Sequence, residues 1–339
     1  MTAGAVQTAP RDQQADESSV HLGVAKTAGR VAVRIALSFG RRIALLITLL
    51  ALVFLAVDML PGDAARAALG VDATQEQVRE KSQELGLDDP VPVRFFRWIG
   101  GLSTGDLGTT TLGAPISEVI GARLPNTVLL ALLALIVTSL IAIVGGGVWM
   151  LRPHGIAARI LAPGTMMMLA LPEFVVAIIL VLVFSLGLGL LPAVTTTNAL
   201  NLSNWEVLVL PVLSLALPKG AWNIRVVRSA FIDAASSPHV EAAILDGYSK
   251  WHVLLRHILP VAMPTIAASI GTTTAMLFGG ALVVEVVFNY PGIGALMAGS
   301  VANRDTTLAA SIVAVSAICI MCVLFISDAL KSWSTKGRA

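Results

Sequence analysis

The sequence predicts an all-α, polytopic membrane protein with six transmembrane helices. Hydrophobic residues make up 56% of its 339 residues and charged residues 13%, with a mean hydropathy of +0.82, whereas soluble domains average roughly 25% charged residues. Six apolar stretches are long enough to cross a bilayer, which takes about 20 helical residues. Apolar and polar residues do not alternate as they do in barrel strands, and unbroken apolar runs in lipid satisfy their backbone groups only as helices.

The six stretches set the expected organisation of the chain. They lie at about residues 43–60, 125–150, 160–190, 207–232, 263–288 and 307–330. Residues 1–30 are small and polar, which is typical of a disordered cytosolic extension, and residues 31–60 hold the first transmembrane helix. Residues 61–123 form a longer polar segment with short helices, and residues 124–334 form a core of five helices.

Segment 61–123 contains two local signals. Residues 72–85 are strongly charged, place Val78 and Leu85 on one face and are followed by Gly86, which predicts a surface helix with a glycine stop. Residues 93–99 include two phenylalanines and a tryptophan, and aromatic rings gather at the headgroup level of a membrane. The aromatic stretch is therefore expected at the membrane surface.

The basic residues indicate the orientation. Sixteen of the 23 Lys and Arg residues fall beside the two termini, the 152–159 connection and a charged loop at about residues 233–260, and seven fall on the other side. Lys219, Arg225 and Arg228 are counted with that loop. Since positive charge is retained in the cytosol, both termini and the loop are expected there, and segment 61–123 is expected to be extracytoplasmic. The net charge of +2 gives no support for nucleic-acid binding.

The charged loop carries its own helix signals. Ser237 and Pro238 predict a helix start, with a hydroxyl cap and a proline in the first turn. Gly247 should end this helix after about two turns. Ser249 should begin a second helix that ends near Pro260, because the proline ring clashes with the preceding turn.

The string EAAILDGYSKWHVLLRHILP at residues 241–260 resembles the EAA signature of permease subunits of bacterial ABC importers. The positions on the signature are Glu241, Ala242, Ala243, Gly247, Leu259 and Pro260. His257 stands where the signature has isoleucine. The resemblance implies that this loop, from Pro238 onward, docks on a cytosolic ATPase and carries its motion into the membrane. A solvated loop with accidental helix signals is the alternative.

A second resemblance covers the chain from about residue 40 to 330. The blocks that carry it are DMLPGD at 58–63, LGLDDPVPVRFFRWIGGLSTGDLGTT at 85–110, RLPNTVLLALLALIV at 123–137 and VVEVVFNYPGIGALMAGSVANRD at 283–305. They resemble the B-type permease subunit of ABC importers of the dipeptide/oligopeptide class, which also includes nickel and glutathione importers. The resemblance implies a type I ABC importer permease fold in a bacterial cytoplasmic membrane.

The same resemblance implies partners. They would be a second homologous permease, two ATP-binding subunits that hold ATP and Mg, an extracytoplasmic solute-binding protein and a peptide substrate. The chain has no G-x-x-x-x-G-K-[ST] loop, so we expect it to be no enzyme and to bind no cofactor itself. A secondary transporter would need ion sites and interrupted repeats, and a channel would need a filter loop. Pro172 and Glu173 are the only residues that suggest a secondary transporter.

Two carboxylates within apolar stretches are candidates for the translocation path. Glu173 follows Pro172 near the middle of the third stretch, and ionisable groups in the membrane usually face an aqueous path. The alternative for Glu173 is a carboxylate that is bonded within the protein. Glu285 lies about one turn from the outer end of the fifth stretch, where it would make a packing or gating contact at an outer vestibule.

Other motifs have simpler explanations. Cys319 and Cys322 form C-x-x-C among apolar residues, which indicates packing rather than redox chemistry. The histidines lack metal-ligand spacing, and no metal site is expected. The glycines at 145–147 and 279–280 permit close helix packing.

Overall fold

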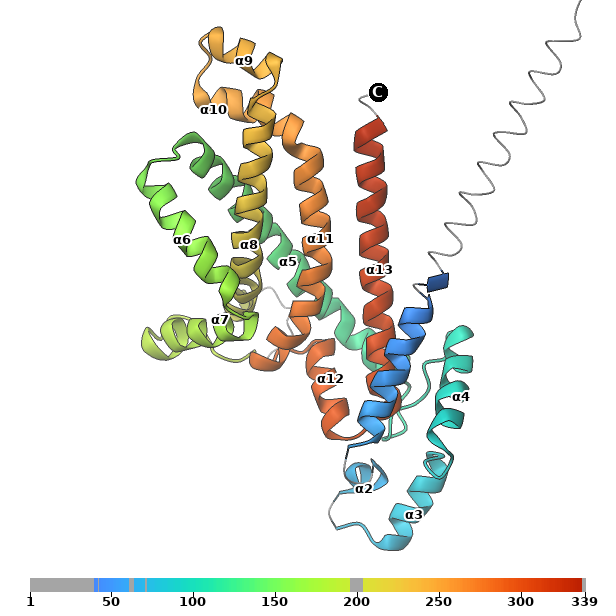
Figure 1. Ribbon diagram of the computed structural model, residues 1–339. Helices are drawn as coiled ribbons and strands as arrows, with labels where there is room; N and C mark the ends of the chain where they lie inside the picture. Colours follow the sequence, from blue (N-terminus) through green and yellow to red (C-terminus); the bar gives the residue numbers. More distant parts are fainter. Residues whose placement is uncertain (1–39, 42, 61–63, 71, 196–203, 337–339) are drawn as a thin grey trace, which may run out of the picture. The chain divides into compact units, whose positions relative to one another are not determined.

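The computed structural model describes residues 40, 41, 43–60, 64–70, 72–195 and 204–336, with side chains up to Phe325 (Figure 1). The predicted extension at residues 1–30 and the start of the predicted first helix lie outside the described residues. The chain divides into two compact units, Met1–Leu52 and Val53–Ala339. The described residues are largely helical and contain no β-strand, which confirms the predicted all-α class.

Among the described residues, four helices are long and apolar enough to cross a membrane. They are α5 (Ile116–Leu151), α8 (Glu206–Ala235), the helix Lys250–Val287 that contains α10 (Lys250–Val253) and α11 (Leu259–Val287), and α13 (Thr306–Lys336). α6 (Ile156–Ala170) and α7 (Glu173–Leu180) with its π-helical continuation to Gly187 form a bent pair that is long and apolar enough only when taken together, which gives up to five crossings. A shorter apolar helix covers Ile43–Asp58. The protein is therefore a multi-pass helical membrane protein.

The third apolar stretch is bent rather than straight. α6 and α7 meet at an angle of 111°, so the prediction of one helix over residues 160–190 is wrong in its geometry. Leu171 and Pro172 both have extended backbone between the two helices. The physical reason is that a proline disfavours helical backbone in the residue before it.

α5 and α8 run parallel and pack closely. Ile141 contacts Gly220, and four residues further along both helices Ile224 contacts Gly145. A Cβ atom at Gly145 would lie 2.9 Å from Ile224, which confirms close packing at this glycine cluster. Because the two helices run in the same direction, α6 and α7 return the chain to the end at which α5 began (Figure 1).

α5 begins at Ile116, earlier than the predicted start near residue 125. Pro125 lies inside the helix, and the polar residues Glu118 and Arg123 precede it. The prediction follows hydropathy, which marks the apolar part of the helix only. The helix itself extends beyond that part by about two turns.

The helix Lys250–Val287 continues past Pro260, so the predicted helix end at this proline is wrong. A π-helical segment, Leu254–Ile258, comes directly before it. The backbone N–H of Leu259 donates to the carbonyl of Leu254, five residues back. This wide turn accommodates the proline ring, which lacks a donor and would clash with a regular α-turn.

Segment 61–123 folds into α2 (Ala64–Leu69), α3 (Gln75–Glu84) and α4 (Val91–Ser103). A capping box of Thr74 and Gln77 begins α3, and Gly86 follows it with φ +64°, as predicted. Trp98 of α4 is buried and donates from Nε1 to Ser311 Oγ at 3.1 Å. Only Phe96 among the aromatic residues of α4 is exposed (70%), so most of the predicted membrane-surface stretch serves packing.

Candidate coupling loop and membrane-embedded charge pair

The loop between α8 and the next long helix folds as a short helix, a bend and a second helix. α9 (Pro238–Leu245) has Pro238 in its first turn, and Gly247 follows with φ +80°, a conformation that favours glycine. The Ser249 hydroxyl accepts a hydrogen bond from the His252 backbone N–H at 3.3 Å. The predicted helix start, bend and second start are thus confirmed, whereas the predicted hydroxyl cap is wrong, because the Ser237 hydroxyl donates to the Ala234 carbonyl and does not cap α9.

α9 has one buried and one exposed face. Val240 and Ala243 are buried and pack with apolar residues from the end of α8 and from the helix that follows, including Phe231 and Leu254. Glu241 is exposed. The other signature residues are placed as follows: Ala242, Gly247 and Pro260 are exposed, and Leu259 is half-buried. The two signature alanines therefore lie on different faces of α9, with Ala242 exposed and Ala243 buried.

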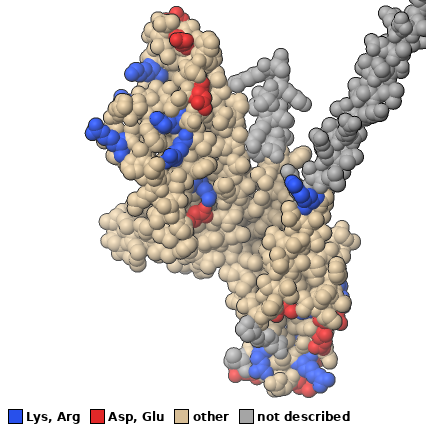
Figure 2. Space-filling view, in the orientation of Figure 1, with Lys and Arg blue, Asp and Glu red and all other residues tan. Residues whose placement is uncertain are grey.

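Large apolar side chains surround the exposed part of the loop. We call the set of Ile244, Leu245, Tyr248 and Trp251 the apolar face of the loop; each of its members is at least half exposed, and Leu245 reaches 83%. Exposed apolar patches mark contact sites for other proteins or for membranes. The sequence carries this signal, because four large apolar residues occupy eight positions of a charged loop. Figure 2 shows Lys and Arg side chains gathered around the same end of the helix bundle.

An ion pair lies between the charged ends of the bundle. Glu173, the first residue of α7, binds Lys219 of α8 with 2.5 Å between Oε1 and Nζ. Their side chains are 17% and 23% exposed. Lys219 lies inside α8 and not in the cytosolic loop with which it was counted, and the same is true of Arg225 and Arg228. Without these three residues, 13 basic residues remain on the predicted cytosolic side against seven on the other, so the predicted orientation is unchanged.

Two family models match the chain. Residues 142–338 match the family described as binding-protein-dependent transport system inner membrane component, and residues 33–126 match the N-terminal domain of the same kind of component. The chain belongs to this family. It is therefore a transport permease subunit of the peptide/nickel class of ABC importers and a multi-pass inner-membrane protein.

Relatives in several bacteria support the assignment. The glutathione transport system permease protein GsiC of Salmonella paratyphi A is 34% identical over 259 residues, which cover 75% of this chain and 81% of the relative. GsiC of Escherichia coli K12 is 33% identical over the same shares. The probable peptide ABC transporter permease protein y4tP of Sinorhizobium fredii is 31% identical over 75% of this chain and 82% of its own length.

Glu285 of the permease is fully buried where α11 meets α12 (Ile293–Ala302). Its Oε2 accepts a hydrogen bond from the Gly294 backbone N–H at 2.5 Å, so the carboxylate lies at the positive N-terminal end of α12. A Cβ atom at Gly292 would collide with this carboxylate. The geometry therefore gives Glu285 a packing contact, which is one of the two roles predicted for it.

The corner beside Glu285 is tied to α5. The Tyr290 hydroxyl donates to the Asn126 carbonyl at 2.8 Å, and Asn126 Nδ2 donates to the Pro291 carbonyl at 2.7 Å. The Thr127 hydroxyl accepts from the Ile293 backbone N–H at 3.0 Å. Sequence reasoning missed these residues, because a buried asparagine and threonine gain meaning only once the corner is folded against them.

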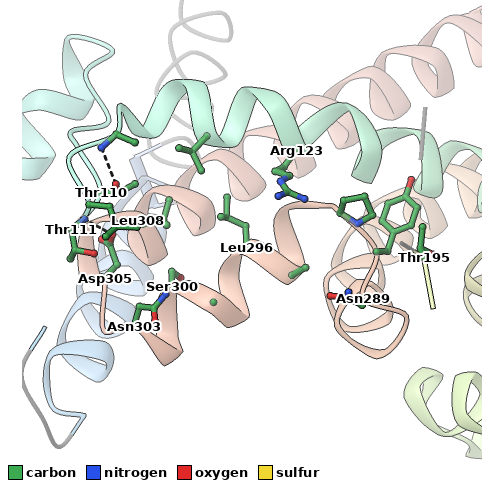
Figure 3. Close-up of a pocket in the computed structure, with 17 residues that line it drawn as sticks. Thr110, Thr111, Arg123, Thr195, Asn289, Leu296, Ser300, Asn303, Asp305 and Leu308 are labelled. Carbon is green, nitrogen blue, oxygen red and sulfur yellow. Dashed lines mark hydrogen bonds between the residues drawn. The ribbon is translucent and has the colours of Figure 1, made fainter. Parts of the chain in front are cut away.

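A cavity of about 750 Å³ with both polar and apolar lining lies beside this corner (Figure 3). Arg123 and Asp305 are the charged residues among those that line it. The Asp305 carboxylate already has hydrogen-bond partners within the protein, because it accepts from the Thr111 and Leu308 backbone N–H groups at 2.8 and 2.9 Å. α12, which supplies part of the lining, lies toward the end of the bundle opposite α9, where an outer vestibule is expected (Figure 1).

Proposed function

We infer that this permease forms one half of an ATP-driven path that imports small peptides delivered by a solute-binding protein. A second permease and two ATP-binding subunits would complete the assembly, and ATP and Mg would be held by the latter. The observation that carries this inference is the apolar face of the loop, exposed on a short helix at the basic end of the bundle. The ATPase would dock there, with the signature residues between Pro238 and Pro260 forming the framework of the loop.

The loop is built to transmit motion. Its second helix runs without a break from Lys250 to Val287, which corresponds to about 57 Å at a rise of 1.5 Å per residue. A displacement at Trp251 therefore reaches the corner at Glu285 along one helix. ATP binding would bring the two docking loops of the dimer together and favour the outward-open state, since a ligand shifts an equilibrium by its differential affinity for two states.

The proposed cargo follows from the relatives. Their names include glutathione and peptide transport, and both kinds of molecule carry an ammonium group and a carboxylate. Glutathione is itself a tripeptide, so this cargo falls within the same proposal. Among the residues that the structure describes, no group of three His, Cys, Asp or Glu side chains could hold a metal ion, and nothing in this part of the chain favours nickel.

The docking proposal is tested by removing one apolar side chain. Leu245→Ser should lower both co-purification of the ATPase and ATP-dependent peptide uptake, because it removes the most exposed apolar side chain of the loop's apolar face. Leu112→Ser is the matched control, since Leu112 is also highly exposed (75%) but lies at the opposite end of the bundle. Normal ATPase binding by the Leu245 variant, or equal loss in both variants, would contradict the docking site.

A further inference from the structure

The charged pair Glu173–Lys219 borders a cavity of about 390 Å³. Glu173 and Lys219 are the charged residues among those that line it. The apolar part of the wall is formed mainly by Leu171, Phe174, Trp222, Met276 and Val283. Cavities for small ligands have volumes of roughly 300–1,000 Å³, with apolar walls and a few placed polar groups. The cavity therefore has the size and composition of a small-molecule site.

Three helices hold the pair in place. Glu173 begins α7 and Lys219 lies in α8. Gly280 of α11 leaves room for the carboxylate, since a Cβ atom there would collide with it. The glycine pair 279–280 thus does not have the role in helix packing that was predicted for it. An added Cβ atom at Gly279 would have no neighbour within 4 Å, and Gly280 accommodates the Glu173 side chain.

A hydrogen-bond network fixes the backbone of Lys219. Asn223 Nδ2 donates to the Lys219 carbonyl and to Thr273 Oγ1, both at 2.8 Å, and Ser269 Oγ donates to Asn223 Oδ1 at 2.7 Å. Ser269 and Thr273 belong to α11. Lys219 is therefore held against the helix that continues into the coupling loop.

Two observations indicate that this cavity is in contact with water and not with lipid. A charged pair is costly in hydrocarbon and normally faces a water-filled cavity or the protein interior. Leu171 and Pro172, which also line the cavity, have non-helical backbone, and such backbone is tolerated at membrane depth only where it is buried in protein or lines water. Glu173 and Lys219 keep about a fifth of their side-chain surface exposed, so a molecule in the cavity can reach both.

We propose that Glu173 and Lys219 form a cargo subsite for zwitterions, in which Glu173 binds the ammonium group of a peptide and Lys219 binds its carboxylate. The inference rests on the proposed peptide import and adds the residues that recognise the cargo. A zwitterion exchanges one ion pair for two and leaves no charge unpaired. A cargo with a single charge leaves one member of this largely buried pair without a counter-ion, which is unfavourable. The apolar wall tolerates different side chains.

The test compares three forms of one labelled dipeptide: free, N-acetylated and C-amidated. ATP-dependent uptake is measured in vesicles that hold the complete importer, at concentrations that saturate the binding protein with each form. The rate of each variant is divided by the wild-type rate for the same form, which cancels selection by the binding protein. Glu173→Gln and Lys219→Met each remove one charge and keep the approximate shape.

The subsite predicts opposite selectivity in the two variants. Glu173→Gln should reduce uptake of the free and the C-amidated form roughly tenfold and spare the N-acetylated form. Lys219→Met should reduce uptake of the free and the N-acetylated form and spare the C-amidated form. Arg97→Gln is the control, because Arg97 forms an exposed ion pair with Asp89 at 2.6 Å outside the long helices, and it should leave all ratios near one.

Equal loss of all three forms in both variants, with recovery in the double variant, would show that the pair only stabilises the fold and would overturn the inference. Unchanged uptake of all forms would overturn it as well. A wild-type importer that takes up none of the three forms would instead contradict the proposed peptide cargo. The two failures are therefore distinguished by the wild-type measurement.

Discussion

Single residues decide whether the corner between α11 and α12 can form. Asn289 adopts φ +48°, a left-handed conformation that asparagine tolerates better than most residues. Gly292 leaves space for the Glu285 carboxylate, and a Cβ atom at Gly294 would collide with the backbone of Leu282. Asn289, Gly292 and Gly294 are required at their positions for steric reasons. The buried Tyr290, Asn126 and Thr127 are required because of the hydrogen bonds that they form.

Tyr290→Phe should destabilise the permease by about 0.5–1.5 kcal/mol, because it removes the buried hydrogen bond from the Tyr290 hydroxyl to the Asn126 carbonyl. Burial raises the pKa of Tyr290, and the nearby Glu285 carboxylate raises it further. The hydroxyl therefore stays protonated, and the loss should be the same between pH 6 and 9. The measurement is thermal unfolding in detergent. Tyr248→Phe is the control, since Tyr248 is the only other tyrosine of the chain and is exposed; an equal effect in the two variants would refute the role of this bond.

Gly247→Val should weaken coupling of the ATPase, because φ +80° costs a side-chain-bearing residue about 1–2 kcal/mol and more when it is β-branched. Gly105→Val is a matched control: Gly105 has φ +87°, and at either glycine an added Cβ atom would have no neighbour within 4 Å. Gly105 lies in the predicted extracytoplasmic segment, so its strain should leave ATPase binding intact. Co-purification and ATP-dependent uptake are compared, and the prediction fails if Gly105→Val impairs ATPase binding as much.

At the scale of elements, hydropathy and helix signals predict where helices lie better than how they continue. The glycine that follows α3, the start of α9 and the bend at Gly247 follow from local chemistry and are predicted correctly. The continuous helix through Pro260, the bend before Glu173 and the pairing of Lys219 are not. Each depends on a neighbouring element: a π-turn absorbs Pro260, and Lys219 finds its partner 46 residues away. A single sequence does not show such partners.

The network between α8 and α11 should make these two helices move together. Thr273→Val removes the bond from Asn223, and interhelical hydrogen bonds in membranes contribute about 0.6 kcal/mol each and up to about 1.7. We expect the number of peptides imported per ATP hydrolysed to fall roughly two- to fivefold, in line with such energies. Thr272→Val is the control, because Thr272 is the next residue on α11 and its hydroxyl bonds only to carbonyls of its own helix. Equal ratios in the two variants would refute the coupling role of the network.

At the scale of the whole molecule, the two ends of unit Val53–Ala339 have different surfaces, and we propose a different role for each end. One end carries the coupling loop with basic side chains around it (Figures 1 and 2), and α12, which lines the cavity beside the α11–α12 corner, lies toward the other end (Figure 1). The C-terminal end of α13 lies at the same end as α9 (Figure 1). Positive charge at the loop end agrees with a cytosolic position, which is where an ATPase would meet it.

The central claim is that the loop's apolar face contacts the ATPase, and site-specific photo-crosslinking tests it directly. A photo-reactive phenylalanine analogue at position 245 should crosslink the permease to the ATP-binding subunit in intact membranes, because Leu245 is the most exposed member of that face. The same probe at position 112 should give no such product. An importer that assembles and transports with the probe at position 245, yet shows no crosslink to the ATPase, would contradict the account.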